Sequence, residues 1–464
     1  MKKRTLMQKA AHSTLSPVFR RIGHREGLEP SAVRDGVAAG HIAVCRPGRG
    51  DGAEPVGIGS GLRVKVNANL GTSQSRPSLS RELKKLDAAV AAGADAVMDL
   101  STGGDLDGIR RAIIDRSPVT VGTVPIYQAA VDTLRRRPGR IDTMSPDSIF
   151  EVIEAHAADG VGFVTVHCGL TLNSLERIRR QKRLLGIVSR GGAFLAEWMT
   201  SRGEENPLYS QFDRLLEIAV RYDLVLSLGD ALRPGAGRDA SDHGQFQELL
   251  TLGELTLRAR EAGVQVMIEG PGHMSIDQIQ ANVFLEKKIC LGAPFYVLGP
   301  LVTDSAPGYD HITSAIGGAV AAWAGADFLC YVTPSEHLGL PDIEDVRQGV
   351  VGSRIAAHAA DLARGRPDAL ERDRRMSVCR QALDWEGQER HALDPAPISR
   401  YRRSGRLPEG EVCTMCGPYC SIKGMKDVLN CTPGKDRGSE APSAGRKGSG
   451  KAQRSSSRGS ERKS

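Results

Sequence analysis

The chain has 464 residues, of which 40% are hydrophobic and 25% charged, an ordinary composition for a globular protein. Its net charge of +7 comes almost entirely from residues 435–464, where nine Lys or Arg stand against three Asp or Glu. The rest of the chain is close to neutral, which excludes a charge-driven specific nucleic-acid or membrane partner. No apolar run reaches the ~18 residues of a membrane span, and nine scattered cysteines do not resemble a secreted disulfide framework. We therefore expect a cytoplasmic protein with reduced thiols.

The N-terminal part of the chain differs in character from the central part. Helix-like stretches lead into a segment rich in Gly and Pro at 46–61, so we predict an appendage and linker over 1–60. From 61 to 361, short apolar runs with many β-branched residues alternate with helix-like segments.

The clearest of these helices is predicted at 146–158. Ser145 is its expected N-cap, Pro146 occupies the first helical position, and Gly160 follows its end. The apolar runs on either side of such helices predict strands. Nine runs are candidate strands: 64–69, 96–100, 119–124, 162–166, 185–188, 224–228, 264–268, 295–298 and 328–332.

Repeated strand–helix units predict parallel strands, and eight of them close into an α/β fold of the (β/α)8 TIM-barrel type over 61–361. Nine candidates are one too many, so one is wrong or lies outside the barrel. The alternative is an open doubly wound sheet, which the lack of a Gly-rich dinucleotide fingerprint disfavours. After the barrel we predict a charged helical region at 362–403, an iron–sulfur cluster segment at 404–433 and a disordered basic tail at 434–464.

Polar residues recur at the carboxyl ends of the predicted strands, where TIM barrels place their catalytic groups. Each one alone could be a loop cap or turn former, but the set predicts a binding site for a phosphate, sugar hydroxyls and a ring. The phosphate donors would come from the segment after the 185–188 run, the acceptors from other strand ends, and two histidines are candidate metal ligands. The candidates are Asn69, Met98, Tyr127, His167, Ser189, Arg190, Gly191, Asp230, Arg233, Glu269, His273, Tyr296 and His337.

Three cysteines, Cys413, Cys416 and Cys420, lie within eight residues of one another. Three thiolates can hold three irons of a [4Fe–4S] cluster and leave the fourth iron open for S-adenosylmethionine. The alternative is a structural zinc site that takes Cys431 as its fourth ligand, although zinc ribbons usually contain two Cys-x-x-Cys pairs. The isolated cysteines (Cys45, Cys168, Cys290, Cys330 and Cys379) are interpreted as buried or incidental, and only Cys168, beside His167, is expected near the site.

Between residues 64 and 423 the sequence resembles the ThiC family, the phosphomethylpyrimidine synthases of thiamine biosynthesis. The segments that carry this resemblance include Val97-Met-Asp-Leu-Ser-Thr-Gly, Gly186-Ile-Val-Ser-Arg-Gly-Gly, Ser227-Leu-Gly-Asp-Ala-Leu-Arg-Pro-Gly, Met267-Ile-Glu-Gly-Pro-Gly-His and Cys330-Tyr-Val-Thr-Pro-Ser-Glu-His. Two departures stand out. Ala231 occupies a position where Gly is common, and three rather than four residues separate Cys416 from Cys420.

The resemblance implies a radical S-adenosylmethionine lyase that converts 5-aminoimidazole ribonucleotide to 4-amino-5-hydroxymethyl-2-methylpyrimidine phosphate. It implies a [4Fe–4S] cluster on Cys413, Cys416 and Cys420, zinc on His273 and His337, a reducing electron donor and a homodimer. The implied substrate contacts are Asn69, Met98, Tyr127, His167, Ser189, Arg190, Gly191, Asp230, Ala231, Leu232, Arg233, Glu269 and Tyr296.

Two other functions stay open at this point. A paralogous 5-hydroxybenzimidazole synthase would use the same substrate and cluster for the cobalamin lower ligand. A zinc-knuckle protein that binds nucleic acid through the basic tail is the alternative from a different class.

Overall fold

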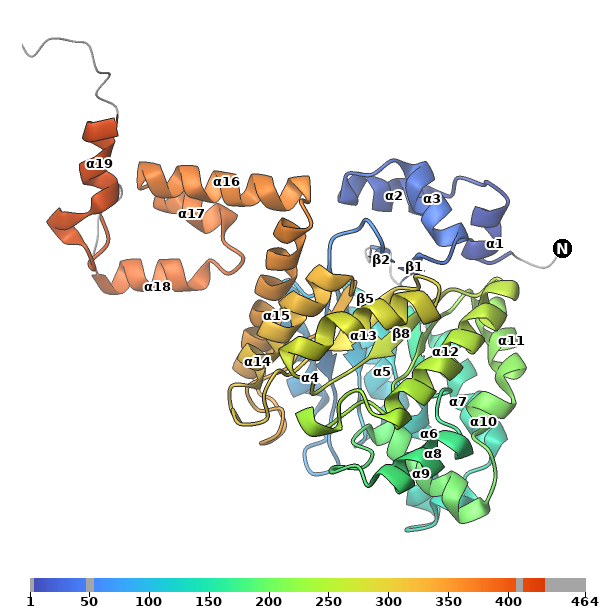
Figure 1. Cartoon of the computed structure of the whole chain (residues 1–464). Helices are drawn as coiled ribbons and strands as arrows, with labels where there is room; N and C mark the ends of the chain where they lie inside the picture. Colours follow the sequence, from blue (N-terminus) through green and yellow to red (C-terminus); the bar gives the residue numbers. More distant parts are fainter. Residues whose placement is uncertain (1–3, 47–53, 406–411, 430–464) are drawn as a thin grey trace, which may run out of the picture.

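The computed structural model describes residues 4–46, 54–405 and 412–429. Its centre is a closed barrel of eight parallel strands, in the order β10-β3-β4-β5-β6-β7-β8-β9. The predicted (β/α)8 class is therefore confirmed (Figure 1). The barrel strands are β3 (Lys65–Leu70), β4 (Ala96–Asp99), β5 (Thr120–Thr123), β6 (Phe163–Val166), β7 (Val225–Leu228), β8 (Val266–Gly270), β9 (Phe295–Leu298) and β10 (Phe328–Cys330).

The candidate strand at 185–188 is wrong. This run lies in the connection between two consecutive helices, and its side chains Leu185 and Val188 are 53% and 40% exposed. A barrel strand needs a hydrogen-bonded neighbour on each side and a buried face. The eight true strands already pair with one another around the barrel, so the run remains a loop.

Helices surround the barrel and follow the strands in sequence. The helix predicted at 146–158 is confirmed as α7 (Pro146–Asp159), with the Ser145 side chain accepting the Ser148 N–H and Gly160 ending it in the left-handed region at φ 98°. The other helices from the barrel are α4 (Leu79–Ala91), α5 (Leu106–Arg116), α6 (Pro125–Arg136), α8 (Leu172–Gln181), α9 (Arg190–Arg202), α10 (Pro207–Ser210), α11 (Phe212–Tyr222), α12 (His243–Glu261), α13 (Ile276–Ile289), α14 (Asp310–Ala324) and α15 (Ile343–Ala363).

The N-terminal part closes the amino-terminal end of the barrel. Three helices, α1 (Leu6–Ala11), α2 (Pro17–Glu26) and α3 (Pro30–Ala38), precede an antiparallel hairpin of β1 (Ile42–Cys45) and β2 (Val56–Gly59). Successive residues of β1 face opposite ways, since Val44 packs with the helices and Cys45 packs with the barrel core. The sequence interpretation of 46–61 as a linker therefore missed a strand, although residues 47–53 lie outside the described part.

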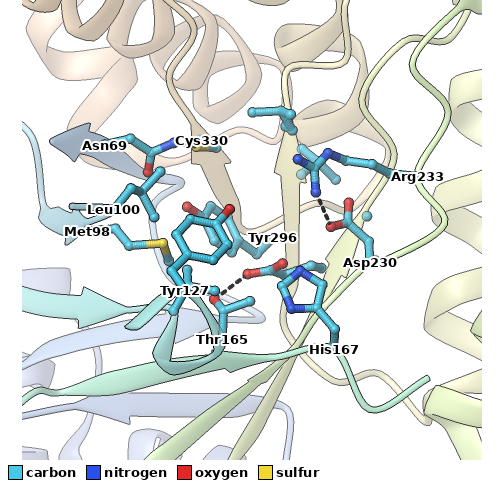
Figure 2. Close-up of a pocket in the computed structure, with 15 residues that line it drawn as sticks. Asn69, Met98, Leu100, Tyr127, Thr165, His167, Asp230, Arg233, Tyr296 and Cys330 are labelled. Carbon is cyan, nitrogen blue, oxygen red and sulfur yellow. Dashed lines mark hydrogen bonds and ion pairs between the residues drawn. The ribbon is translucent and has the colours of Figure 1, made fainter. Parts of the chain in front are cut away.

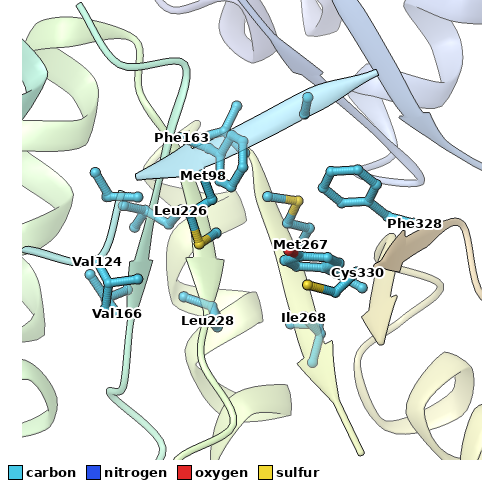
Figure 3. Packing of buried hydrophobic residues seen from close by; sticks show 14 of the residues in the cluster. Met98, Val124, Phe163, Val166, Leu226, Leu228, Met267, Ile268, Phe328 and Cys330 are labelled. Carbon is cyan, nitrogen blue, oxygen red and sulfur yellow. The ribbon is translucent and has the colours of Figure 1, made fainter. Parts of the chain in front are cut away.

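Aromatic side chains fill the barrel below its carboxyl end. Phe328 stacks on Tyr296 with ring centroids 4.3 Å apart and meets Phe163 edge-on at 6.3 Å. Figure 3 shows Phe163, Phe328 and Met267 packed between the strands. Because these side chains fill the interior, any ligand pocket inside the barrel must open at the carboxyl ends of the strands.

The C-terminal helices leave the barrel from the opposite end. α15 returns to the amino-terminal end of the barrel. There Arg366 donates to the carbonyl oxygen of Gly61, just ahead of β3, and to that of Glu26 at the end of α2. From there the chain continues into α16 (Pro367–Ala382), α17 (Trp385–His391), α18 (Ala396–Gly405) and α19 (Ser421–Leu429), which extend away from the barrel (Figure 1). The helices α16, α17 and α18 lie largely in the segment 362–403, for which a helical region was predicted. The predicted tail at 434–464 lies outside the described residues.

None of the helices in the described ranges combines the length and the apolar character needed to cross a bilayer.

Candidate active site

A pocket with about 460 Å³ of empty space, part of it open to solvent, lies at the carboxyl end of the barrel. Eight of the residues predicted from strand ends line it, on strands from β3 round to β9 (Figure 2). They are Asn69, Met98, Tyr127, His167, Asp230, Arg233, Glu269 and Tyr296.

Glu269 on β8 is fixed by two hydroxyl groups from neighbouring strands. Thr165 Oγ1 donates to Glu269 Oε1 over 2.6 Å, and Ser227 Oγ donates to the same oxygen over 2.9 Å. Burial raises the pKa of Glu269, and the two hydroxyls oppose that rise because they stabilise the carboxylate. The Asp230 side chain also lies against this carboxylate and opposes the rise, so Glu269 and Asp230 form one acidic group in the pocket.

The turn after β7 presents a carboxylate and a guanidinium together. Arg233 Nη1 lies 3.0 Å from Asp230 Oδ1, and this ion pair faces Tyr127 across the pocket (Figure 2). Burial raises the pKa of Asp230 well above its ordinary value, while Arg233 opposes the rise. Ala231 and Leu232, which the resemblance places in the substrate site, are fully buried and donate their amide N–H groups to Glu248.

His167 lines the pocket, and the start of α9 lies directly behind it without joining the lining. Ser189 Oγ lies 2.9 Å from His167 Nε2 and also accepts the N–H of Gly192 as the helix N-cap. A Cβ on Gly191 would stand 2.4 Å from the His167 ring, so only glycine permits this approach. Burial lowers the pKa of His167 to about 3. The ring is thus neutral, and its buried Nδ1 has no partner in the structure.

Arg190, the first residue of α9, is exposed beside the pocket. Its guanidinium carbon lies 5.1 Å from the centre of the Tyr127 ring, within range of a cation–π contact. The amino end of a 13-residue helix therefore meets a guanidinium at the pocket rim. Both features favour an anion such as a phosphate.

A polar group around Cys330 completes the pocket wall. Asn69 Nδ2 lies 3.2 Å from Cys330 Sγ, and Asn67 Nδ2 lies 2.7 Å from the Tyr296 hydroxyl. Burial raises the pKa of Cys330 to about 12, so the group is a thiol at neutral pH. Cys330 and Cys168 are both buried, in line with the interpretation of the isolated cysteines as buried. No signal in the sequence indicated that Cys330 lines the pocket, whereas Cys168 only adjoins the lining residue His167.

His273 and His337 meet near the pocket with their Nε2 atoms 3.2 Å apart. Asp304 Oδ1 holds His273 Nδ1 at 2.7 Å, and Asp310 Oδ1 holds His337 Nδ1 at 3.1 Å. If each Nδ1–H donates to its carboxylate, two Nε2 lone pairs face one another, an arrangement that a cation between them relieves. Two nitrogens bound tetrahedrally to one zinc stand about 3.3 Å apart, close to the separation seen.

The cysteine segment lies beyond α18 and outside the barrel. The backbone N–H groups of Cys416 and Met415 lower the pKa of Cys413, as suits a thiolate ligand. Desolvation raises the pKa of Cys416, and Cys413 and Cys420 raise it further, so the three thiols lie near one another. Within the described ranges, no three His, Cys, Asp or Glu side chains form a ready-made metal-binding group.

Four residues that bear on the site were not predicted from the sequence: Thr165, Ser227, Glu248 and Cys330. Thr165 lies on β6 two positions before His167, which directly follows the strand, so the alternation of a strand predicts both side chains on one face. That signal could have found it. Glu248 carries no comparable signal, because it reaches the site from the middle of α12.

Comparison with known proteins agrees with this geometry. Residues 5–427 match the model of the radical SAM ThiC family. Proteins named phosphomethylpyrimidine synthase from Desulforamulus reducens, Geobacter metallireducens and Moorella thermoacetica are 56%, 55% and 57% identical to this chain. Each comparison covers 92% of this chain, and 99%, 98% and 98% of the respective relative. A solved dihydropteroate synthase from Thermus thermophilus matches 65% of this chain and 93% of its own at 17% identity and a TM-score of 0.37, too little to carry an argument.

A family match over nearly the whole chain, with relatives above one-half identity, excludes the zinc-knuckle alternative and implies S-adenosylmethionine and an iron–sulfur cluster as cofactors. The chain is a radical SAM enzyme and belongs to the ThiC family.

Proposed function

We propose that this enzyme converts 5-aminoimidazole ribonucleotide to 4-amino-5-hydroxymethyl-2-methylpyrimidine phosphate in thiamine biosynthesis. The observation that carries the proposal is the identity of 55–57% to three phosphomethylpyrimidine synthases over 92% of the chain. The pocket supports it independently. Its lining carries two carboxylates and an amide that suit a sugar and an imidazole ring. Arg190, at the start of α9, lies against Tyr127 of that lining.

Different residues of the site bind different parts of the substrate. Arg190 and the amino end of α9 bind the phosphate. Asn69, Asp230 and Glu269 accept hydrogen bonds from ribose hydroxyls and the ring amine. The unpaired Nδ1 of His167 gains its hydrogen-bond partner from the substrate, which repays the cost of leaving that atom buried alone. A pocket closed below by aromatic side chains keeps water from reactive intermediates.

The cofactors follow from the donor groups. Cys413, Cys416 and Cys420 would hold a [4Fe–4S] cluster, which three thiolates can bind with one iron left open. The chemistry that this cluster supplies when bound is the one-electron cleavage of S-adenosylmethionine to a 5′-deoxyadenosyl radical, with the electron coming from an external donor. His273 and His337 would hold zinc, supported by their separation and by the carboxylate behind each ring.

A homodimer suits the position of the cysteines. The helices α16 to α19 start at the end of the barrel opposite the pocket and lead away from it (Figure 1). The cluster of one chain is then available to the pocket of a second copy. An exposed apolar stripe on α14, made of Ile312, Ile316 and Trp323, also suits contact with another chain. The free thiols of the described residues agree with a cytoplasmic enzyme.

A product assay tests the proposal. The anaerobically reconstituted enzyme is incubated with 5-aminoimidazole ribonucleotide, S-adenosylmethionine and a strong reductant, and the products are separated and weighed by mass spectrometry. We expect the pyrimidine phosphate together with 5′-deoxyadenosine. A benzimidazole in place of the pyrimidine would overturn the proposal in favour of the cobalamin branch, and zinc without iron at the cysteines would overturn the radical chemistry.

A further inference from the structure

Behind the pocket, one buried carboxylate holds the turn that carries Asp230 and Arg233. Glu248 on α12 is 3% exposed, and its two oxygens accept separate backbone N–H groups. Oε1 accepts from Ala231 over 2.9 Å, and Oε2 accepts from Leu232 over 2.7 Å. These two amides lie between Asp230 and Arg233 in the sequence, so the carboxylate fixes the backbone that links the two pocket side chains.

The other side of the same turn is also held. Arg183, which precedes α9, donates Nη2 to the carbonyl oxygen of Leu232 over 2.6 Å. Its Nε also pairs with Asp242, the N-cap of α12, over 2.8 Å. The turn is thus held by the Glu248 carboxylate, which accepts from two of its N–H groups, and by the Arg183 guanidinium, which donates to one of its carbonyl oxygens. Both depend on α12, because Glu248 belongs to this helix and Arg183 pairs with its N-cap.

Glu248 has little freedom to move. A Cβ placed on Gly169, in the loop after β6, would stand 2.8 Å from Glu248 Cγ, so this loop presses directly on the side chain. A cavity adjoins the carboxylate, with about 30 Å³ of space for the centres of water molecules and with Gln245, Asn282, Asp230 and Glu269 among its lining residues. That space is enough for water beside the carboxylate. The carboxylate can therefore be solvated.

We propose that Glu248 is a positioning residue for this reaction: its carboxylate clamps the Ala231–Leu232 backbone, and through it aims Asp230 and Arg233 into the pocket. For the identity of the substrate, this inference rests on the function proposed above. Glu248 itself touches no substrate. It acts by keeping the turn in one shape, so that no binding energy is spent on ordering it.

The clamp has a pH dependence of its own. Burial raises the pKa of Glu248 to about 8, and the two amides, Arg183 and Arg233 oppose the rise. The charged and titratable groups around the cavity and the turn are Asp230, Arg233, Glu269 and Arg183. Above that pKa both N–H bonds end on a carboxylate, and below it a proton takes one of the acceptor positions. Substrate affinity should therefore rise with pH between 7 and 9.

The test compares Glu248→Gln with wild type and with Glu254→Gln, which makes the same change on the exposed face of α12. The readout is the dissociation constant for 5-aminoimidazole ribonucleotide without turnover, at pH 7, 8 and 9. Glutamine replaces one carboxylate oxygen with an NH₂ group, which cannot accept the N–H of Ala231 or Leu232 and points its own hydrogen at it. At pH 9, where the wild-type side chain is charged, we expect weaker binding in Glu248→Gln by about tenfold to a hundredfold, the effect of one lost charge-assisted hydrogen bond, with a smaller difference at pH 7. We also expect the rise in affinity between pH 7 and 9 to disappear, while Glu254→Gln matches wild type.

The inference would be overturned if Glu248→Gln bound the substrate as tightly as wild type and with the same pH dependence. A loss of affinity with the pH dependence unchanged would overturn it too, because that is the result of general loosening. If Glu248→Gln does not fold, as judged by its melting temperature, Glu248→Asp keeps the charge and must retain the pH dependence with weaker binding. A wild-type enzyme that makes no pyrimidine but still shows these binding differences would refute the proposed function alone.

Discussion

Replacing Thr165 by valine tests whether the hydroxyl on β6 sets the ionisation of Glu269. The change removes a 2.6 Å hydrogen bond to Glu269 Oε1 and preserves the shape of a side chain that is 3% exposed. A hydrogen bond to a charged group contributes about 1.5–3 kcal/mol, which corresponds to roughly one to two pKa units. Since the hydroxyl stabilises the carboxylate, its loss raises the pKa of Glu269 further.

The assay is the pH profile of kcat/KM for formation of the pyrimidine phosphate. We expect the acidic limb to move to higher pH by about one unit, so that kcat/KM on that limb falls by up to about tenfold. The remaining bond from Ser227, at 2.9 Å, keeps the carboxylate in place, so the effect is one of ionisation more than of orientation.

Thr120→Val is the matched control. Thr120 lies on β5 of the same barrel, is fully buried, and its hydroxyl has no hydrogen-bond partner in the structure. This variant should keep the wild-type profile. An unshifted acidic limb in Thr165→Val, or equal losses in the two variants, would refute the role given to the Thr165 hydroxyl.

Three further predictions concern His167, the histidine pair and the cysteines. The pKa of about 3 for His167 lies below the unfolded value of about 6.5. As pH falls from 6.5 towards 3, only the unfolded chain gains this proton, so stability decreases by up to ~1.4 kcal/mol per pH unit. In His167→Gln this contribution should be absent when unfolding is compared at pH 7 and 5; equal acid sensitivity would contradict it. His337→Asn should lose zinc but keep cluster iron by elemental analysis, and retained zinc would place the metal elsewhere. Cys416→Ala should abolish S-adenosylmethionine cleavage and leave substrate binding within about threefold, on the general expectation that distant sites act independently; loss of both would assign the cysteine segment a structural role.

The sequence by itself determined the class of the fold and most of the pocket. Strand–helix alternation predicts a parallel sheet, and the rule that barrel sites lie at carboxyl strand ends picks out residues such as Asn69, His167 and Glu269, which the structure brings into one pocket. Both inferences need only the local pattern of the chain, because the carboxyl ends of parallel strands necessarily meet at one end of the barrel.

Only the tertiary structure decided which apolar runs pair and which cysteine faces the ligand. The run at 185–188 has the composition of a strand but no free edge to join, because eight strands already close the barrel. The segment at 56–59 looks like a linker but pairs with β1 under the barrel. Cys330 enters the pocket because barrel closure sets it in register with Asn67, on a strand more than 260 residues away in sequence. Local periodicity carries no information about such a pairing, since closure of the barrel is a property of all eight strands together.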